Sequence, residues 1–546
     1  MEGTYIMKNE IRFRRFGTMI DCSRNAVMTV ASLKKWIDLT SDLGYNALLL
    51  YTEDTYEVDG HPYFGYMRGR YTKGELQEID SYAMEKGMEL IPCIQTLAHL
   101  TTLIRWPEYD AIADTADILL ADEEKTYEFI DRLFASISSC YSSRLVNVGM
   151  DEAYWLGHGR YYELHGDVAR SEILLSHLQR VADIGKKYGL QLTMWSDMFF
   201  HLATGSGYAG YQDSMNIDET VKEKIPDNVQ LVYWCYGDTE KKRYDSMLVA
   251  HEKLKKDTWY AGGLIKWCGF TPKNQFTMKV LNASMTSCIE NGIQDVILTL
   301  WGDNGGECSN FAMIPSLFYA SELAKGNTNK AEMKTRFKEK FGVSFERFML
   351  LDLPMSIMDR NSGQNPEKYL LYNDCFMGLM DSTLAGGENV AYAKNARSLA
   401  LMKKHSEWGY LFEMQRALCA ALAIKAELGV KTHEVYQSRD KEQLHALILE
   451  YKKFQKRLNV FYRAFRKQWY VENKPQGFEV QDIRIGGLML RVKNCTERLQ
   501  ALYDGTIENI EELEEKQLDY LGAGEELSHK PIGLNVWKEI VSANVI

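Results

Sequence analysis

The chain has 546 residues, of which 45% are hydrophobic and 25% charged, a composition typical of globular proteins rather than disordered ones. This length exceeds one ordinary core, so we expect two or three domains. The formal net charge of -11 and the lack of a basic tract argue against nucleic acid as a partner. No apolar run is long enough to span a bilayer, so we expect no membrane partner.

The cysteines indicate a reducing compartment. Ten occur, with no Cys-x-x-Cys pair, and several lie within apolar runs. Buried reduced thiols are typical of cytosolic proteins, and the chain does not open with a signal-peptide pattern. The sequence therefore predicts a cytoplasmic protein, with a secreted protein that has lost its signal as the alternative.

From about residue 14, short apolar runs alternate with amphipathic helical stretches. The expected strands are 16–21, 47–51, 90–94, 146–149, 191–195, 230–234, one within 259–267, and 295–301. The clearest helices between them are expected at 32–43, 73–86, 125–140 and 173–187. Eight such units in about 300 residues predict an α/β fold, a (β/α)8 TIM barrel over residues 14–320. A doubly wound sheet is the second alternative.

The sequence patterns at the two ends of the chain differ from those of the predicted barrel. Residues 1–13 are expected to form a short N-terminal arm. After residue 321 the strand patterns stop and helical periodicity dominates, so residues 321–546 are predicted to form a mostly α-helical C-terminal domain.

Polar and aromatic residues follow the expected strands at their carboxyl ends, where barrel enzymes carry their chemistry. Two consecutive acids, Asp151 and Glu152, follow the fourth strand. The other strand ends supply Asp21, Arg24, Glu53, Asp54, Gln95, His99, Trp195, Asp197, Trp234, Tyr236, Asp238, Trp267, Trp301, Asp303 and Glu307. Aromatic walls around a few polar groups predict a small-ligand pocket, and Trp and Tyr faces suit the apolar face of a pyranose.

The adjacency of Asp151 and Glu152 limits the catalytic roles that the two acids can take. Glycoside cleavage needs an acid for the leaving oxygen and a negative group near the oxocarbenium-like centre. Neighbouring side chains on a strand alternate, so these two converge only if the chain turns at Asp151. Such a pair suits one acid that donates the proton beside one that positions the substrate. No His pair has metal-binding spacing, which argues against a metal site. We expect no metal and no organic cofactor.

Several segments, in order, resemble glycoside hydrolase family 20, the β-N-acetylhexosaminidases. They are 19–24 (Asp-x-x-Arg type), 70–92 with His99, 149–152 (Gly-Met-Asp-Glu, against Gly-Gly-Asp-Glu), 195–198 (Trp-Ser-Asp-Met), and Trp301 followed by acids. The resemblance covers about residues 14–310 and rests on the order of motifs that are individually weak.

The resemblance implies a retaining, substrate-assisted mechanism, in which the 2-acetamido oxygen attacks the anomeric carbon to give an oxazolinium ion. It makes Glu152 the acid/base, with a raised pKa, and Asp151 the residue that holds the acetamido group. The implied substrate-binding residues are Arg24, His99, Trp195, Asp197, Trp234, Tyr236, Trp267, Trp301, Asp303 and Glu307. Arg24 would hold the C3 and C4 hydroxyls, and Asp303 or Glu307 the C4 and C6 hydroxyls.

The sequence departs from the family pattern at several positions. Asn147 stands where many members have His, Met150 replaces a Gly, and Gln95 replaces an acid. The Tyr-x-Asp spacing expected on the seventh strand occurs instead at 236–238, after the sixth. With no N-terminal α/β domain and with a helical C-terminal region, the chain is predicted to belong to a divergent branch.

We therefore expect an exo-acting β-N-acetylhexosaminidase that releases terminal β-linked GlcNAc or GalNAc from an oligosaccharide or glycoconjugate. One alternative is a conventional retaining glycosidase with Glu152 as acid and Glu307 as nucleophile. Another is a catalytically silent carbohydrate-binding protein. The sequence leaves a homo-oligomer open.

Overall fold

A computed structural model gives the fold of the chain and describes residues 10–204, 217, 219–357, 365–402, 404–405, 407–524 and 532–544. Most of the expected N-terminal arm, residues 1–9, lies outside these ranges. The chain divides into two compact units. The first comprises 1–265, 275–302 and 316–336, and the second comprises 266–274, 303–315 and 337–546. The expected boundaries at residues 13 and 320 stay predictions.

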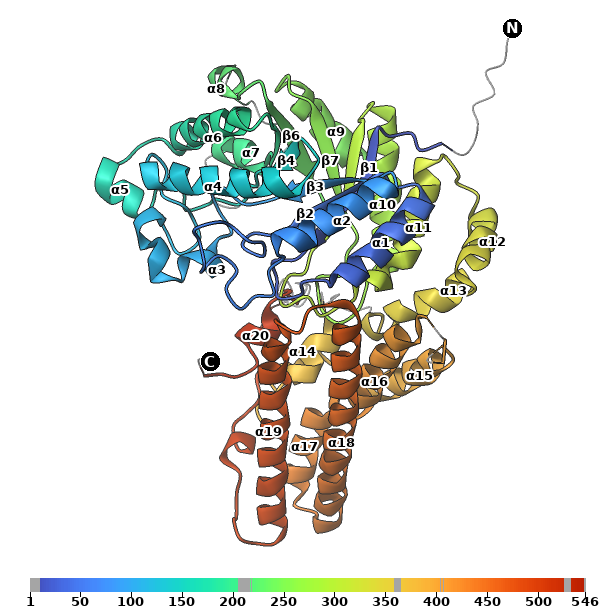
Figure 1. Cartoon of the computed structure of the whole chain (residues 1–546). Coiled ribbons are helices and arrows are strands. Elements are labelled where there is room, and N and C mark those ends of the chain that lie inside the picture. The colour runs from blue at the N-terminus through green and yellow to red at the C-terminus, as the bar shows by residue number, and fades with distance from the viewer. Residues whose placement is uncertain are drawn as a thin grey trace. The chain divides into compact units, whose positions relative to one another are not determined.

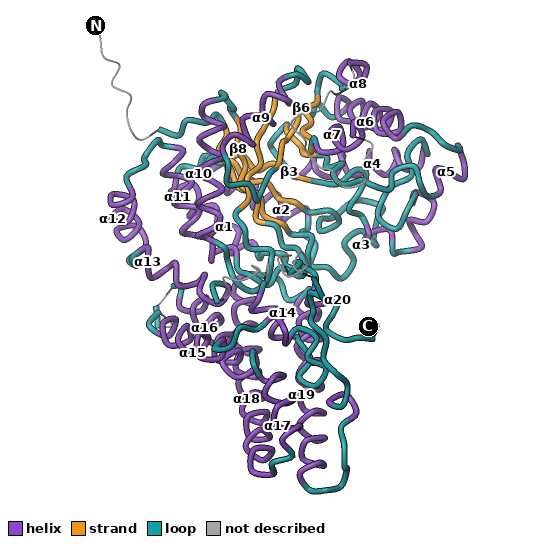
Figure 2. Tube along the Cα trace, turned by 180° about the vertical axis from the view of Figure 1, so that it is seen from behind, coloured by secondary structure: helices purple, strands orange, loops and turns teal. Residues whose placement is uncertain are grey.

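Eight parallel strands close into a barrel in chain order, which confirms the (β/α)8 prediction. They are β1 (Arg15–Asp21), β2 (Ala47–Tyr51), β3 (Glu89–Cys93), β4 (Leu145–Asn147), β5 (Gln191–Trp195), β6 (Val229–Trp234), β7 (Thr258–Gly263) and β8 (Asp295–Leu300). Figure 2 shows these strands surrounded by helices. Because β1 pairs with β8 from Arg15↔Asp295 to Ile20↔Leu300, the sheet has no free edge, and the doubly wound alternative is wrong.

The helices of the first unit connect the strands. They are α1 (Val30–Leu43), α2 (Lys73–Glu85), α3 (Thr101–Ile104), η1 (Pro107–Ile112), α4 (Glu124–Cys140), α5 (Arg160–His165), α6 (Arg170–Lys187), α7 (Asp197–Thr204), α8 (Glu219–Lys224), α9 (Lys241–Glu252), α10 (Asn274–Glu290) and α11 (Ile314–Ala324). Local sequence sets their ends. Thr72 and Glu75 form a capping box at the start of α2, and Gly44 ends α1 with a φ of 96°.

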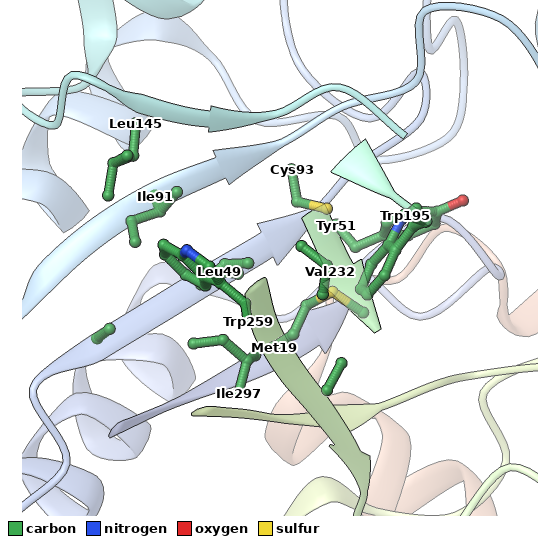
Figure 3. Close-up of a cluster of buried hydrophobic side chains, with 12 residues drawn as sticks. Met19, Leu49, Tyr51, Ile91, Cys93, Leu145, Trp195, Val232, Trp259 and Ile297 are labelled. Carbon is green, nitrogen blue, oxygen red and sulfur yellow. The ribbon is translucent and has the colours of Figure 1, made fainter. Parts of the chain in front are cut away.

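The interior of the barrel is filled by side chains that alternate along the strands. The cluster consists of Met19, Ala47, Leu49, Tyr51, Ile91, Cys93, Leu145, Trp195, Val232, Trp259, Ala261 and Ile297, as Figure 3 shows. Trp234 and Trp301 pack against it and stay partly exposed. Such a filled barrel has no pore, and sites on this fold lie at the carboxyl ends of the strands.

The second unit is helical, as expected after residue 321. Helix α12 (Lys330–Phe341) passes from the first unit into it. Its other elements are α13 (Phe345–Phe348), η3 (Met349–Met355), α14 (Pro366–Tyr372), η4 (Asp381–Thr383), α15 (Glu388–Ala400), α16 (Gly409–Lys425), α17 (Leu428–Ser438), α18 (Lys441–Glu472), α19 (Phe478–Tyr503), η5 (Glu511–Leu513) and α20 (Val536–Glu539), and η2 (Asn310–Met313) precedes α11. The long helices α18 and α19 run side by side in Figures 1 and 2.

Candidate active site

The chain turns sharply where β4 ends. Gly149, Met150 and Glu152 all have left-handed backbones, with φ of 73°, 68° and 52°. The Asn147 side chain helps to fix this turn, because its Oδ1 accepts a hydrogen bond from the Gly149 amide at 2.9 Å. The strand therefore ends at Asn147, two residues earlier than expected, and the alternation that would separate two neighbouring side chains is broken.

His99 joins the two carboxylates of the pair. Its Nε2 lies 3.2 Å from Asp151 Oδ2 and 3.6 Å from Glu152 Oε2, so the neighbouring acids converge on one imidazole. Burial opposes a charge on His99, but the Asp151 carboxylate outweighs it and raises the pKa of His99 to about 9. Burial likewise opposes the charge on Asp151, and His99 with Gln95 holds its pKa below the ordinary value. Asp151 is thus an ionised, buried acceptor.

A hydrogen-bonded relay reaches Asp151 from the ends of β1 and β2. Gln95 Nε2 lies 2.8 Å from Asp151 Oδ1 and 3.0 Å from the Tyr51 hydroxyl. The Tyr51 hydroxyl donates to Glu53 Oε1 at 3.0 Å, and Arg24 Nη2 lies 3.4 Å from the same oxygen. Burial raises the pKa of Glu53 to about 7 despite the nearby guanidinium. Arg24 is therefore paired with a buried carboxylate that Tyr51 and Gln95 link to Asp151.

Glu152 is positioned through its backbone and remains accessible through its side chain. Its amide donates to Asp197 Oδ2 at 2.9 Å, and the Tyr154 hydroxyl donates to Glu152 Oε1 at 3.4 Å. The Glu152 side chain is 39% exposed, whereas that of Asp151 is 10% exposed. Burial and the charge of Asp151 raise the pKa of Asp197 to about 7, and a hydrogen bond from the Trp234 side chain counters part of that shift.

Four of the predicted aromatic residues form contacts at this end of the barrel. Trp301 meets Tyr51 edge-on at 4.7 Å and Trp195 at 6.1 Å between ring centroids. Trp234 and Tyr236 stack at 5.2 Å with 21° between their planes. The indole Nε1 of Trp195 is buried and finds no hydrogen-bond acceptor among the residues that the structure describes.

Asp21 ties the first strand to the last. Its Oδ2 accepts from the Gly302 amide at 2.9 Å, while its Oδ1 accepts from the Ser23 amide and hydroxyl. The Asp21 carboxylate therefore holds together the loops that follow β1 and β8. Asp21 lies just before Arg24 in the sequence.

Three predicted site residues, Trp267, Asp303 and Glu307, belong to the second compact unit. Both carboxylate oxygens of Glu307 form ion pairs within that unit. Its Oε2 lies 2.5 Å from Lys368 Nζ and its Oε1 lies 3.3 Å from Arg484 Nη1. The side chains of Glu307 and Lys368 are 2% and 0% exposed, so this carboxylate is a buried ion-pair partner.

Sequence reasoning missed Tyr51 and Tyr154 and gave Gln95 no role. Tyr51 had a usable signal: two residues after Leu49, it shares the inward face of β2 and closes that strand. Tyr154 follows the acid pair directly, but its reach back to Glu152 depends on a turn that the sequence pattern does not reveal.

Within the described ranges, no group of three or more His, Cys, Asp or Glu side chains is arranged to hold a metal ion. Among the helices of these ranges, none has the length and apolar character needed to cross a membrane. All ten cysteines are free thiols.

Two family descriptions match the chain. Residues 13–235 match the catalytic domain of glycosyl hydrolase family 20, and residues 346–531 match the glycoside hydrolase 20C C-terminal domain.

Individual relatives are distant. Hexosaminidase D from Bos taurus is 24% identical over 226 residues, which cover 39% of this chain and 61% of that protein. A β-hexosaminidase from Akkermansia muciniphila is 23% identical over 178 residues, 27% of this chain and 36% of that protein. The chain thus spans less than two thirds of the curated relatives it matches. An exo-β-N-acetylglucosaminidase structure from Vibrio harveyi aligns at 16% identity with a TM-score of 0.47, covering 63% of this chain and 59% of that one.

Proposed function

The chain belongs to glycoside hydrolase family 20, and from this we propose that it is an exo-acting β-N-acetylhexosaminidase, which removes terminal β-linked GlcNAc or GalNAc from oligosaccharides or glycoconjugates. The observation that carries the proposal is the convergence of Asp151 and Glu152 on His99, at 3.2 and 3.6 Å. One acid is buried and ionised, and the other is accessible at the mouth of the barrel.

We assign the two acids different steps of one retaining reaction. The acetamido carbonyl oxygen attacks the anomeric carbon while the bond to the leaving oxygen breaks, and Glu152 donates its proton to that oxygen. Asp151 accepts the acetamido N–H and stabilises the positive charge of the oxazolinium ion. Glu152 then takes a proton from water, whose oxygen attacks the anomeric carbon while the bond from that carbon to the acetamido oxygen breaks, which restores the configuration. The relay from Gln95 and His99 fixes Asp151 in the ionised state that this role needs.

Other groups at the barrel end suit a sugar ring. Arg24 would grip ring hydroxyls through charge-assisted hydrogen bonds, and Trp195, Trp234 and Trp301 would wall the acetamido methyl and the sugar face. The Tyr236 hydroxyl and the Trp195 indole N–H are the donors we assign to the acetamido oxygen. Asp303 stays our prediction for the C4 and C6 hydroxyls, because both oxygens of Glu307 are already paired.

The defining experiment measures hydrolysis of the p-nitrophenyl β-glycosides of GlcNAc and GalNAc. Wild type should turn over at least one, and Glu152→Gln should lower kcat about 10³-fold. Asp151→Asn should lower kcat by about 10²- to 10³-fold and leave the fold intact. Glu163→Gln, an exposed acid on α5, is the matched control.

Two outcomes would favour the alternatives. Turnover that an acetamido-derived thiazoline does not inhibit would favour a conventional nucleophile, although the buried ion pairs of Glu307 already count against that residue. No turnover of either epimer would favour a silent carbohydrate-binding protein. We keep a cytoplasmic location as a prediction, which the ten free cysteines support.

A further inference from the structure

Trp155 lies three residues after Glu152 and is the most unusual aromatic side chain of the site region. It is 66% exposed, whereas Trp36, Trp195, Trp259 and Trp469 are fully buried. An exposed indole forgoes the stabilisation that burial of a large apolar side chain gives. We propose that Trp155 is the platform on which the sugar next to the scissile bond, on the aglycone side, stacks; this rests on the proposed function.

Trp155 lies close to Glu152 along the chain. Three residues span at most about 11 Å, so the Trp155 backbone lies within that distance of Glu152. The turn shortens the path further, because the Tyr154 amide donates to the Glu152 carbonyl at 2.7 Å. Since Glu152 must reach the glycosidic oxygen, the sugar attached to that oxygen has to lie beside Glu152 on its exposed side.

Hydrogen bonds hold the loop around Trp155 on both sides. Leu156 is buried, and its amide donates to the Ala153 carbonyl at 3.1 Å. The buried Asp114 accepts from the Gly157 amide at 3.1 Å and from the Tyr161 amide at 2.7 Å. Arg170 Nη1 donates to the Tyr154 carbonyl at 2.8 Å. A loop held on both sides lowers the ordering cost of binding at the indole, because its backbone is already placed.

The chemistry of the ring identifies its ligand class. A Trp face offers a flat apolar surface with negative potential, which complements the C–H face of a pyranose. His158 contacts the indole edge-on at 6.1 Å between centroids. A second sugar of the substrate is therefore the occupant to which the proposal commits, rather than a protein partner.

The test compares a disaccharide, N,N′-diacetylchitobiose, with the methyl β-glycoside of GlcNAc, which has no ring to stack. Trp155→Ala should lower kcat/KM for the disaccharide about tenfold, mainly through KM, and should change that of the methyl glycoside by less than about twofold. Trp155→Phe should recover most of the loss. Tyr162→Ala, which removes a 53% exposed ring from α5, is the control.

Each result is decisive. Equal losses on both substrates would show that Trp155 acts on Glu152 and would overturn the platform. An unchanged disaccharide rate in Trp155→Ala would do the same. If wild type turns over neither p-nitrophenyl epimer, the proposed function fails instead, so the two failures are distinguishable.

Discussion

Gln95 holds Asp151 and the turn before it at the same time. Its Nε2 lies 2.8 Å from Asp151 Oδ1, and its Oε1 accepts from the Met150 amide at 3.2 Å. One neutral side chain therefore orients the carboxylate and closes the left-handed turn that brings Asp151 and Glu152 together. An acid at position 95 could not donate to Asp151 unless it were protonated.

Gln95→Glu should accordingly move activity toward acid pH. Two carboxylates about 2.8 Å apart cannot both ionise, so one must carry a proton. We expect kcat to fall at least tenfold at pH 8 and to recover partly at pH 5. Gln95→Met removes the hydrogen bonds without adding charge and should lower kcat with no such recovery. Parallel pH profiles for the two variants would contradict the assignment.

Gly149→Ala should disable the site. A Cβ there would lie 2.0 Å from Gln95 Oε1, and the φ of 73° is unfavourable for any other residue. We expect a loss of at least 100-fold in kcat, since a small displacement of reacting groups has effects of that size. Gly189→Ala is the control, because it has a φ of 66° with no atom within 4 Å. Strain alone would affect both variants equally, so equal losses would refute the role of Gln95.

Met150→Gly should destabilise the protein even though it relieves a left-handed backbone. The strain of that conformation is about 1–2 kcal/mol, whereas loss of a buried Met side chain costs about 2–5 kcal/mol. Met150 is fully buried, so burial outweighs strain. Met67→Gly is the matched control, with a φ of 61° and 69% exposure, and should be neutral or stabilising. Chemical denaturation of both variants measures the difference.

Asp197→Asn should change how stability depends on pH. The unfolded carboxyl ionises near pH 4, but burial raises its folded pKa to about 7. Between these values the unfolded state binds fewer protons, so the wild type loses stability as pH rises, and that loss is complete above about pH 7. Relative to wild type, the variant should therefore gain stability from pH 4 to 7 and no further beyond.

Thermal unfolding from pH 4 to 9 tests this dependence. The exposed Asp110→Asn should follow the wild type across the range. A constant difference between Asp197→Asn and wild type would mean that Asp197 does not titrate near pH 7.

Glu307→Gln should lower the free energy of unfolding rather than kcat. It leaves the buried Lys368 without its closest anionic partner, which typically costs about 3–5 kcal/mol. Glu307→Leu combined with Lys368→Met should recover part of that loss. The folded variant should keep kcat within about tenfold on the p-nitrophenyl substrates. Loss of activity with rescue by azide would instead identify Glu307 as a nucleophile.

The sequence predicted the barrel well because each strand is a short apolar run between amphipathic helices. It misplaced the end of β4, since Gly149 and Met150 leave the strand through left-handed conformations that apolar patterning does not encode. The seventh strand, Thr258–Gly263, lies within the expected stretch of 259–267 apart from its first residue, whereas residues 266–274 belong to the second unit.

The sequence predicted that Asp151, Glu152 and His99 gather at one end of the barrel, because they lie in the loops that follow β3 and β4. The hydrogen-bond partners of these residues were harder to predict, because a bond such as that from the Tyr51 hydroxyl to Glu53 depends on the direction of each side chain. Glu307 shows what position after a strand does not reveal: both of its oxygens lie beside cations 61 and 177 residues away in sequence.

Because the barrel is closed, the point at which the chain is cut decides whether a fragment keeps an intact sheet. The family match to the catalytic domain ends at residue 235, after six of the eight strands. A fragment cut there would lack β7 and β8, so β1 would lose its pairing with β8 and Asp21 its bond from Gly302. The freed edges of β1 and β6 would each offer unpaired backbone groups to other chains. Such a fragment should aggregate on expression, whereas one that extends through β8 and α11 keeps the sheet closed on itself.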